Sequence, residues 1–154
     1  MAIATNTNLD GLKRGSVAVV GAAESDLGQV APNTNPMDLM AQATLRALED
    51  CGLTLKDVDG LFVAATQVLM GPMAFAEYLR IKPRYFDGTI IGGSSFMSHV
   101  AHAHAALQLG LCSVAVIAYG STQRSVSRAA ASPRDFNPYE SPYRPFLPSS
   151  AYAM

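Results

Sequence analysis

Charge is what this 154-residue sequence has least of. Asp, Glu, Lys and Arg make up 15% of it, against roughly 25% in a typical soluble domain. Twelve acidic residues nearly balance eleven basic ones, for a net charge of -1, so nothing attracts the chain to nucleic acid or to an anionic membrane. Hydrophobic residues stand at an ordinary 49%. We therefore expect a partner subunit, or another part of the same protein, to cover much of the surface.

Cysteine is scarce as well, since the chain contains Cys51 and Cys112 alone. They form no CxxC pair, which excludes a thioredoxin-type or zinc-knuckle motif, and a domain of this size needs no disulfide. The first twelve residues lack a basic stretch followed by an apolar one, so no signal peptide is indicated. No apolar run approaches the about 18 residues of a membrane-spanning helix. We expect a reduced, cytoplasmic protein without a membrane span.

What the sequence does contain is an alternation of short apolar runs with helical patterns. The runs typical of strands buried on both faces lie at 16–21, 61–66, 84–91 (interrupted at 87–88) and 113–118. The expected helices cover 36–51, 72–79 and 96–109. Asn35 is the expected N-cap of the first helix, Pro36 its first residue and Gly52 its stop. This order predicts an α/β fold in which helices cover both faces of a mostly parallel sheet.

The chain divides into three expected parts: a flexible arm at 1–14, an α/β half at 15–120 and a proline-rich loop region at 121–154. Five of the nine prolines fall in the last part, and residues 148–154 have the pattern of an N-cap and a first helical turn. Two interpretations follow, a truncated first half of a longer protein and a short chain with a disordered tail. Five aromatic residues in the tail favour the first. They are Phe136, Tyr139, Tyr143, Phe146 and Tyr152.

The strongest candidate for chemistry is the Gly92-Gly93-Ser94-Ser95 sequence between an expected strand and the 96–109 helix. That helix has almost no charged face, which is typical of a helix buried on all sides in a larger body. Glycines permit a sharp turn and close approach of a ligand. Unpaired N–H groups of the first helical turn would then hold an enolate or thioester oxygen. The simpler alternative is a strand-to-helix turn in which Ser94 or Ser95 is the N-cap.

Other polar residues allow weaker hypotheses. A serine nucleophile at 94 or 95 would need His99 as its base, but no GxSxG elbow is present. His99 and His102 are three residues apart and would be able to share a metal, although structural or interface roles are more typical. Glu24 and Asp26 follow the first expected strand, either at a site or as a solvated pair. Three arginines after the last strand either meet coenzyme A phosphates or contact solvent. They are Arg124, Arg128 and Arg134.

Several stretches resemble the N-terminal half of the thiolase superfamily, most closely its sterol-carrier-protein-X or lipid-transfer type, often labelled acetyl-CoA acetyltransferase. The stretches are 17–28, 47–61, 92–110 and 111–121, and the resemblance covers residues 16–154. It implies a body of two similar α/β halves packed face to face, usually in dimers, of which this chain is the first half. It also implies that residues 121–154 cover the active site and help to bind acyl-CoA.

The sequence departs from the thiolase pattern at the nucleophile. Thiolases carry a cysteine at a position that corresponds to about Gly93, and no cysteine stands at Gly93, Ser94 or Ser95. A subgroup with glycines here resembles aldolases that cleave β-hydroxyacyl-CoA without an acyl-enzyme. In them the glycine-rich turn would stabilise the thioester enolate, the other half would supply the base, and a small zinc-ribbon/OB-fold protein is the partner.

The resemblance thus implies a thiolase-fold enzyme that makes or breaks a carbon–carbon bond of an acyl-CoA thioester. Gly93, Ser94 and Ser95 are the expected catalytic group, and Gly92 and Arg124 the expected substrate contacts. Coenzyme A enters as part of the substrate, and no separate cofactor or metal is expected. We expect a homo-oligomer, and an inactive chain when these residues stand alone. The alternative is a non-catalytic acyl-CoA- or lipid-binding subunit, or an inactive fragment.

Overall fold

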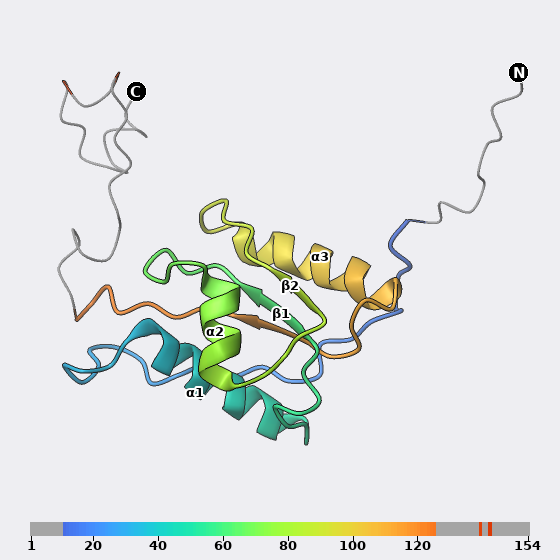
Figure 1. Ribbon diagram of the computed structural model, residues 1–154, viewed down its shortest axis with the longest axis horizontal. Helices are drawn as coiled ribbons and strands as arrows, with labels where there is room; N and C mark the ends of the chain where they lie inside the picture. The colour runs from blue at the N-terminus through green and yellow to red at the C-terminus, as the bar shows by residue number, and fades with distance from the viewer. Residues whose placement is uncertain (1–10, 126–138, 140–141, 143–154) are drawn as a thin grey trace, which may run out of the picture.

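The computed structural model describes residues 11–125 together with Tyr139 and Pro142. Residues 11–125 contain three helices and three strands that alternate along the chain (Figure 1). In order they are α1 (Pro36–Asp50), β1 (Gly60–Val63), α2 (Gly71–Leu79), β2 (Tyr85–Asp87), α3 (Ser95–Gln108) and β3 (Ala115–Ala118). Each of the six overlaps an element that the sequence pattern predicts, and β1, α2 and α3 begin one residue earlier than expected.

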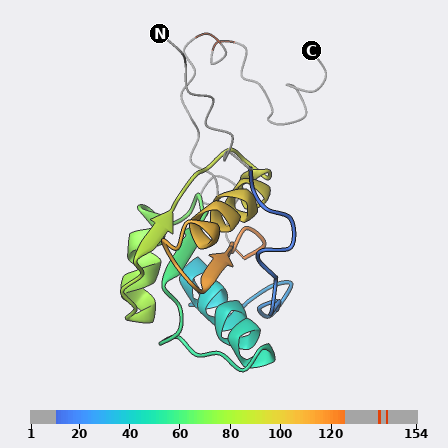
Figure 2. The same ribbon diagram turned by 90° about the vertical axis from the view of Figure 1, so that its right-hand side faces the viewer.

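The strands form one parallel sheet in the order β2-β1-β3, with Gly60 opposite both Tyr85 and Ala115. The central strand β1 is buried along its whole length, and its alternate side chains enter two different cores. Leu61 packs in a cluster with Met40 of α1 and Phe75 of α2. Phe62 packs on the other face of the sheet against α3. Figure 2 shows the sheet between these layers, so the expectation of a parallel α/β fold with helices on both faces is confirmed.

The start of α1 follows the capping rules that its sequence predicts. The Asn35 side-chain oxygen accepts hydrogen bonds from the amides of Met37 (2.8 Å) and Asp38 (3.1 Å), and an Asp38 oxygen accepts one from the Asn35 amide (2.9 Å). These reciprocal bonds form a capping box. The hydroxyl of Tyr78, in α2, donates to the other Asp38 oxygen at 2.5 Å. The cap of α1 therefore also joins the two helices on that face of the sheet.

One expected strand, at 16–21, is wrong. The segment pairs with no strand of the sheet, and Val19 and Val20 are 86% and 62% exposed. An apolar run becomes a buried strand only where a neighbouring strand and a covering layer are present. In the described part of the chain the segment is attached by its ends instead. At its start the Lys13 amide and the Ser16 hydroxyl bond to side chains of α3, and after it the Glu24 carbonyl accepts from an α1 side chain.

Two further expectations need correction. The third extended piece contributes only Tyr85–Asp87 to the sheet, because the Asp87 carboxylate accepts bonds from the amide and hydroxyl of Thr89 and turns the chain away. The all-round burial expected for α3 is also not found. That helix buries one face and leaves Met97 and Val100 exposed on another.

Residues 1–10 of the expected arm and most of the proline-rich region, including Arg128, Arg134 and the expected helix start at 148–154, lie outside the described residues. Among the helices that the structure describes, none has the length and apolar character that crossing a bilayer requires.

Candidate functional site

The candidate site lies at the carboxyl edge of the sheet, where parallel strands usually present their ligand-binding loops. The loop from β2 to α3 ends there in the Gly92-Gly93-Ser94 turn, directly before α3. The segment that follows β3 leaves from the same edge, as Figure 1 shows. The fold therefore brings the glycine-rich turn and the start of the 121–125 segment to one side of the sheet.

The turn is open. Gly92 has a φ of +74°, a conformation that side chains disfavour, and a Cβ added at Gly92 or Gly93 would meet nothing within 4 Å. Gly92, Gly93 and Ser94 are all exposed. The Gly92 carbonyl accepts the Ser95 amide at 3.1 Å, which closes the turn onto the helix. The free space beside Gly92 and Gly93 leaves room for a ligand at this turn.

The N-terminus of α3 has no side-chain cap. Ser94 occupies the N-cap position with φ -78° and ψ -5°, and its side chain makes no capping hydrogen bond. Capping by Ser94, the simpler alternative for this turn, is therefore not found. First-turn N–H groups without a capping side chain carry the positive end of the helix dipole and suit an anionic oxygen.

Ser95 differs from its neighbours because it is buried. It is 1% exposed, its hydroxyl donates to the Gly92 carbonyl at 2.6 Å, and it accepts the Ile91 amide at 2.9 Å. Both hydrogen-bonding functions of the hydroxyl are thus occupied by the turn itself. Ser95 makes no hydrogen bond with His99 among the described contacts, so the geometry of a serine–histidine pair is not formed there.

Two of the three histidines of α3 contact the segment between β2 and α3 or the end of β2. His99 is fully buried, and its Nε2 lies 3.0 Å from the Thr89 carbonyl. Because a carbonyl only accepts, the proton is on Nε2, and the buried Nδ1 has no hydrogen-bond partner. His102 is half-exposed, and its Nδ1 lies 2.5 Å from an Asp87 carboxylate oxygen. The two rings thus hold different loop residues. Within the described ranges, no group of three or more His, Cys, Asp or Glu side chains converges as a metal site.

Asp87 connects this network to the sheet. Burial raises the pKa of its carboxyl, but hydrogen bonds from the Thr89 hydroxyl and amide and from His102 together hold that pKa below its usual range. Asp87 and Thr89 were not candidates on the sequence. The signal that would have found them is the Asp-Gly-Thr sequence after a strand, because an Asp side chain commonly bonds to the backbone two residues later.

An apolar hollow of about 430 Å³ lies beside Asp87. The sequence did not predict it either. Most of its lining is aliphatic or aromatic and comes from the ends of β1 and β2 and from the start of α2. The residues are Val63, Ala65, Val68, Met70, Gly71, Pro72, Met73, Phe86, Asp87, Gly88 and Ile90. Sequence periodicity does not reveal this hollow, because its walls come from two segments that are apart in the sequence, 63–73 and 86–90.

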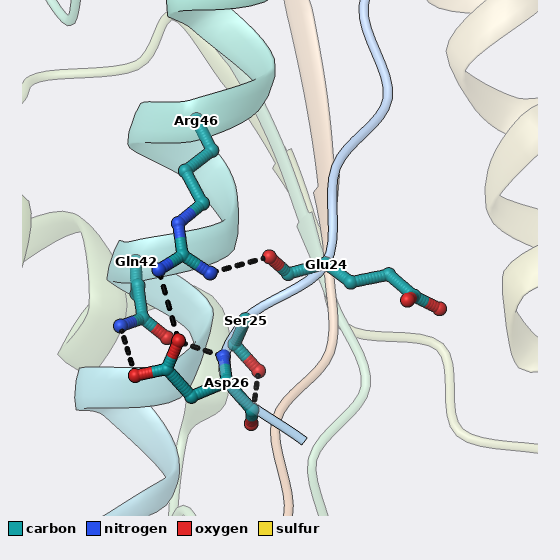
Figure 3. Close-up of polar contacts among 5 residues, drawn as sticks. All are labelled: Glu24, Ser25, Asp26, Gln42 and Arg46. Carbon is teal, nitrogen blue, oxygen red and sulfur yellow. Dashed lines mark hydrogen bonds and ion pairs between the residues drawn. The ribbon is translucent and has the colours of Figure 1, made fainter.

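The remaining candidates lie apart from the turn. Arg124 is exposed in the segment after β3, and no contact among the described residues joins it to Gly92–Ser94. Glu24 and Asp26 lie against α1. The Arg46 guanidinium donates to the Glu24 carbonyl and the Asp26 carboxylate, both at 2.9 Å, and Gln42 exchanges two hydrogen bonds with Asp26 (Figure 3). The bonds from Gln42 and then Arg46 lower the pKa of Asp26. This exposed cluster attaches the N-terminal segment to α1.

The cysteines lie away from the turn as well. Cys112 precedes β3 and is 2% exposed, and burial raises the pKa of its thiol. Its Sγ is beside Gly60, where β1 begins, so it is at the opposite edge of the sheet. Cys51 is the C-cap of α1, and its thiol donates to the Ala47 carbonyl. Neither thiol is presented to a ligand at the carboxyl edge.

Comparison with solved structures shows what this arrangement resembles. The chain is similar to a structure described as the Ltp2-ChsH2(DUF35) aldolase, with a TM-score of 0.58 and 26% identity over 85% of this chain and 34% of that one. A second similar structure is a monomeric SCP2-thiolase-like protein type 1 from Mycobacterium smegmatis, with a TM-score of 0.47, 19% identity, and coverage of 59% of this chain and 20% of that one. No family model matches, and no curated protein matches the sequence.

The fold of the described residues is thus a thiolase-like half, as the sequence resemblance implied. The chain spans about a third of the length of the aldolase chain that it matches. The likeness supports the α/β architecture.

Proposed function

We propose that this chain provides the oxyanion-binding turn of an enzyme that cleaves a β-hydroxyacyl-CoA by a retro-aldol reaction. The observation that carries the proposal is the exposed, uncapped N-terminus of α3, preceded by Gly92 in a left-handed conformation, with no thiol beside it. The likeness to a structure named as an aldolase supports this reaction over acyl transfer.

The proposed reaction uses backbone amides of this chain rather than its side chains. A base removes the proton of the β-hydroxyl group, the Cα–Cβ bond breaks, and its electron pair passes into the thioester as an enolate. Protonation at Cα then releases a shorter acyl-CoA and a carbonyl compound. The amides of Gly93 and Ser94 would donate hydrogen bonds to the enolate oxygen, the group on which negative charge develops. In this proposal the base comes from the second half of the complete protein.

Claisen chemistry through an acyl-cysteine finds less support. It needs a thiolate at the turn, where the chain has glycine and serine. The buried Cys112 thiol, with its raised pKa, is a poor nucleophile and lies at the other edge of the sheet.

Two secondary contacts belong to the same proposal. Arg124, exposed in the segment that leaves the sheet after β3, would meet a phosphate of coenzyme A. The matched structure is named for two components, Ltp2 and ChsH2(DUF35), and we propose that this chain likewise works in an assembly, as a homo-oligomer with a small second protein.

A non-catalytic acyl-CoA-binding subunit is the second candidate. The absent cysteine and the apolar hollow of about 430 Å³ favour it, since such a hollow suits an acyl group without any reacting side chain.

Two assays of the full-length protein distinguish these functions. We expect release of a carbonyl compound from a β-hydroxyacyl-CoA, and no thiolysis of a β-ketoacyl-CoA in the presence of free coenzyme A. Thiolysis without aldol cleavage would contradict the proposal. Tight binding of an acyl-CoA with turnover of neither substrate, measured by calorimetry, would support the binding subunit instead.

A further inference from the structure

The buried face of α3 is polar where it meets the loop that precedes it. Ser95, His99 and His102 are spaced i, i+4 and i+7, so they lie along one side of the helix. Each of the three contacts the segment 87–92. A helix that only filled a core would present apolar side chains there, as α3 does further on with Ala103 and Ala106.

We infer that these three residues act as a clamp that sets the position of the Gly92–Ser94 amides, and that they are positioning residues. The inference rests on the proposed function of that turn. Ser95 holds the Ile91 amide and the Gly92 carbonyl, His99 holds the Thr89 carbonyl, and His102 holds the Asp87 carboxylate. The clamp thus contacts residues 87, 89, 91 and 92, immediately before the Gly93 and Ser94 amides that would bind the enolate oxygen.

His99 gives the clearest sign that the contact itself matters. Its ring is fully buried and leaves Nδ1 without a partner, which costs free energy compared with an apolar ring of similar size. Phe62 and Phe96 pack around it in ring contacts that phenylalanine would also make. What histidine adds is the Nε2–H bond to the Thr89 carbonyl.

Asp87 extends the clamp into the loop. One of its carboxylate oxygens accepts from the Thr89 amide and hydroxyl, both at 2.7 Å, while the other faces His102. Thr89 is therefore fixed from both sides, by Asp87 and by His99. Such bracing matters for oxyanion binding, because a displacement of about 1 Å in a positioned group lowers a rate by about a hundredfold.

The test compares matched variants by hydrogen exchange and by kinetics of the full-length protein. His99→Phe fills the same space without a donor, and His99→Gln restores a donor. For His99→Phe we expect exchange of the 88–96 peptide to accelerate at least tenfold, and kcat to fall at least tenfold with KM within twofold. His99→Gln should return both to within threefold. Ala106→Gly, on the same helix but away from the loop, should lower the melting temperature without changing exchange in that peptide.

His102 supplies a second pair of variants should His99→Phe fail to fold, because its ring is half-exposed. His102→Leu should accelerate exchange of the 88–96 peptide, and His102→Asn, which retains a donor toward Asp87, should not. Unchanged exchange in the folded His99→Phe protein, or equal exchange in the two His102 variants, would overturn the clamp. Accelerated exchange in a protein that cleaves no β-hydroxyacyl-CoA would leave the clamp standing and refute the proposed function.

Discussion

Two substitutions at Ser94 distinguish the role of its backbone amide from the role of its hydroxyl group. Its φ of -78° lies within the range that proline adopts, and no described contact engages its amide or its side chain as a cap. Ser94→Pro therefore removes one N–H group with little strain, and Gly93 before it accepts the restriction that proline imposes. Ser94→Ala removes only the hydroxyl and keeps the amide.

The expected effects differ by orders of magnitude. Loss of one oxyanion donor lowers kcat about 100- to 1,000-fold, or roughly 2.7–4 kcal/mol of transition-state stabilisation. We expect that loss for Ser94→Pro and a change within about threefold for Ser94→Ala, in line with an amide donor and a hydroxyl that does no chemistry.

The assay is release of the carbonyl product from a β-hydroxyacyl-CoA by the full-length protein. Thermal midpoints and circular dichroism of both variants check that the fold is retained. Full activity in a folded Ser94→Pro protein would refute a role for that amide. An equal loss in both variants would assign the chemistry to the serine hydroxyl instead.

Three further predictions concern stability. Gly92→Ala should cost roughly 1–2 kcal/mol, because its φ of +74° strains any side chain although space is free; denaturant titration against Gly93→Ala, expected to be near neutral, checks this. Gly120→Ala should cost at least about 1–3 kcal/mol, since the new Cβ would lie 2.3 Å from the Pro36 carbonyl oxygen; a melting temperature equal to that of the unchanged protein would contradict the packing. Because the folded-state pKa of Asp87 is below its ordinary 3.8, its ionised form stabilises the protein above that pH, and the stabilisation is lost as the pH falls through the folded-state pKa. Asp87→Asn should therefore destabilise the protein at pH 7, and the difference should shrink below pH 3.8; chemical denaturation at several pH values measures it.

Local signals determined most of the secondary structure correctly. The Asn35 cap, Pro36 and Gly52 placed α1 to within a residue or two, because caps and stops act through bonds within one turn. The apolar run at 113–118 contains β3, and the run at 61–66 contains all of β1 except Gly60. The run at 16–21 is similarly apolar but is not a strand. Nothing in its sequence shows whether a neighbouring strand is available to pair with it.

In the candidate site, too, local features were predictable from the sequence and tertiary contacts were not. The Gly92-Gly93-Ser94 turn was evident from its glycines, because their conformational freedom is a local property. The roles of Ser94 and Ser95 were not separable in the sequence, and the structure distinguishes them by exposure, with one open to solvent and the other buried under the turn.

The sequence by itself determined the order of strands and helices from α1 onward, the cap of α1, the glycine turn and the absence of a thiol from it. Only the tertiary structure decided which faces of α3 are buried, that His99 and His102 hold Thr89 and Asp87, and that an apolar hollow opens beside Asp87. The physical reason is range: capping and backbone freedom depend on neighbours within about one helical turn, whereas burial and side-chain partners depend on residues that meet only after the chain has folded.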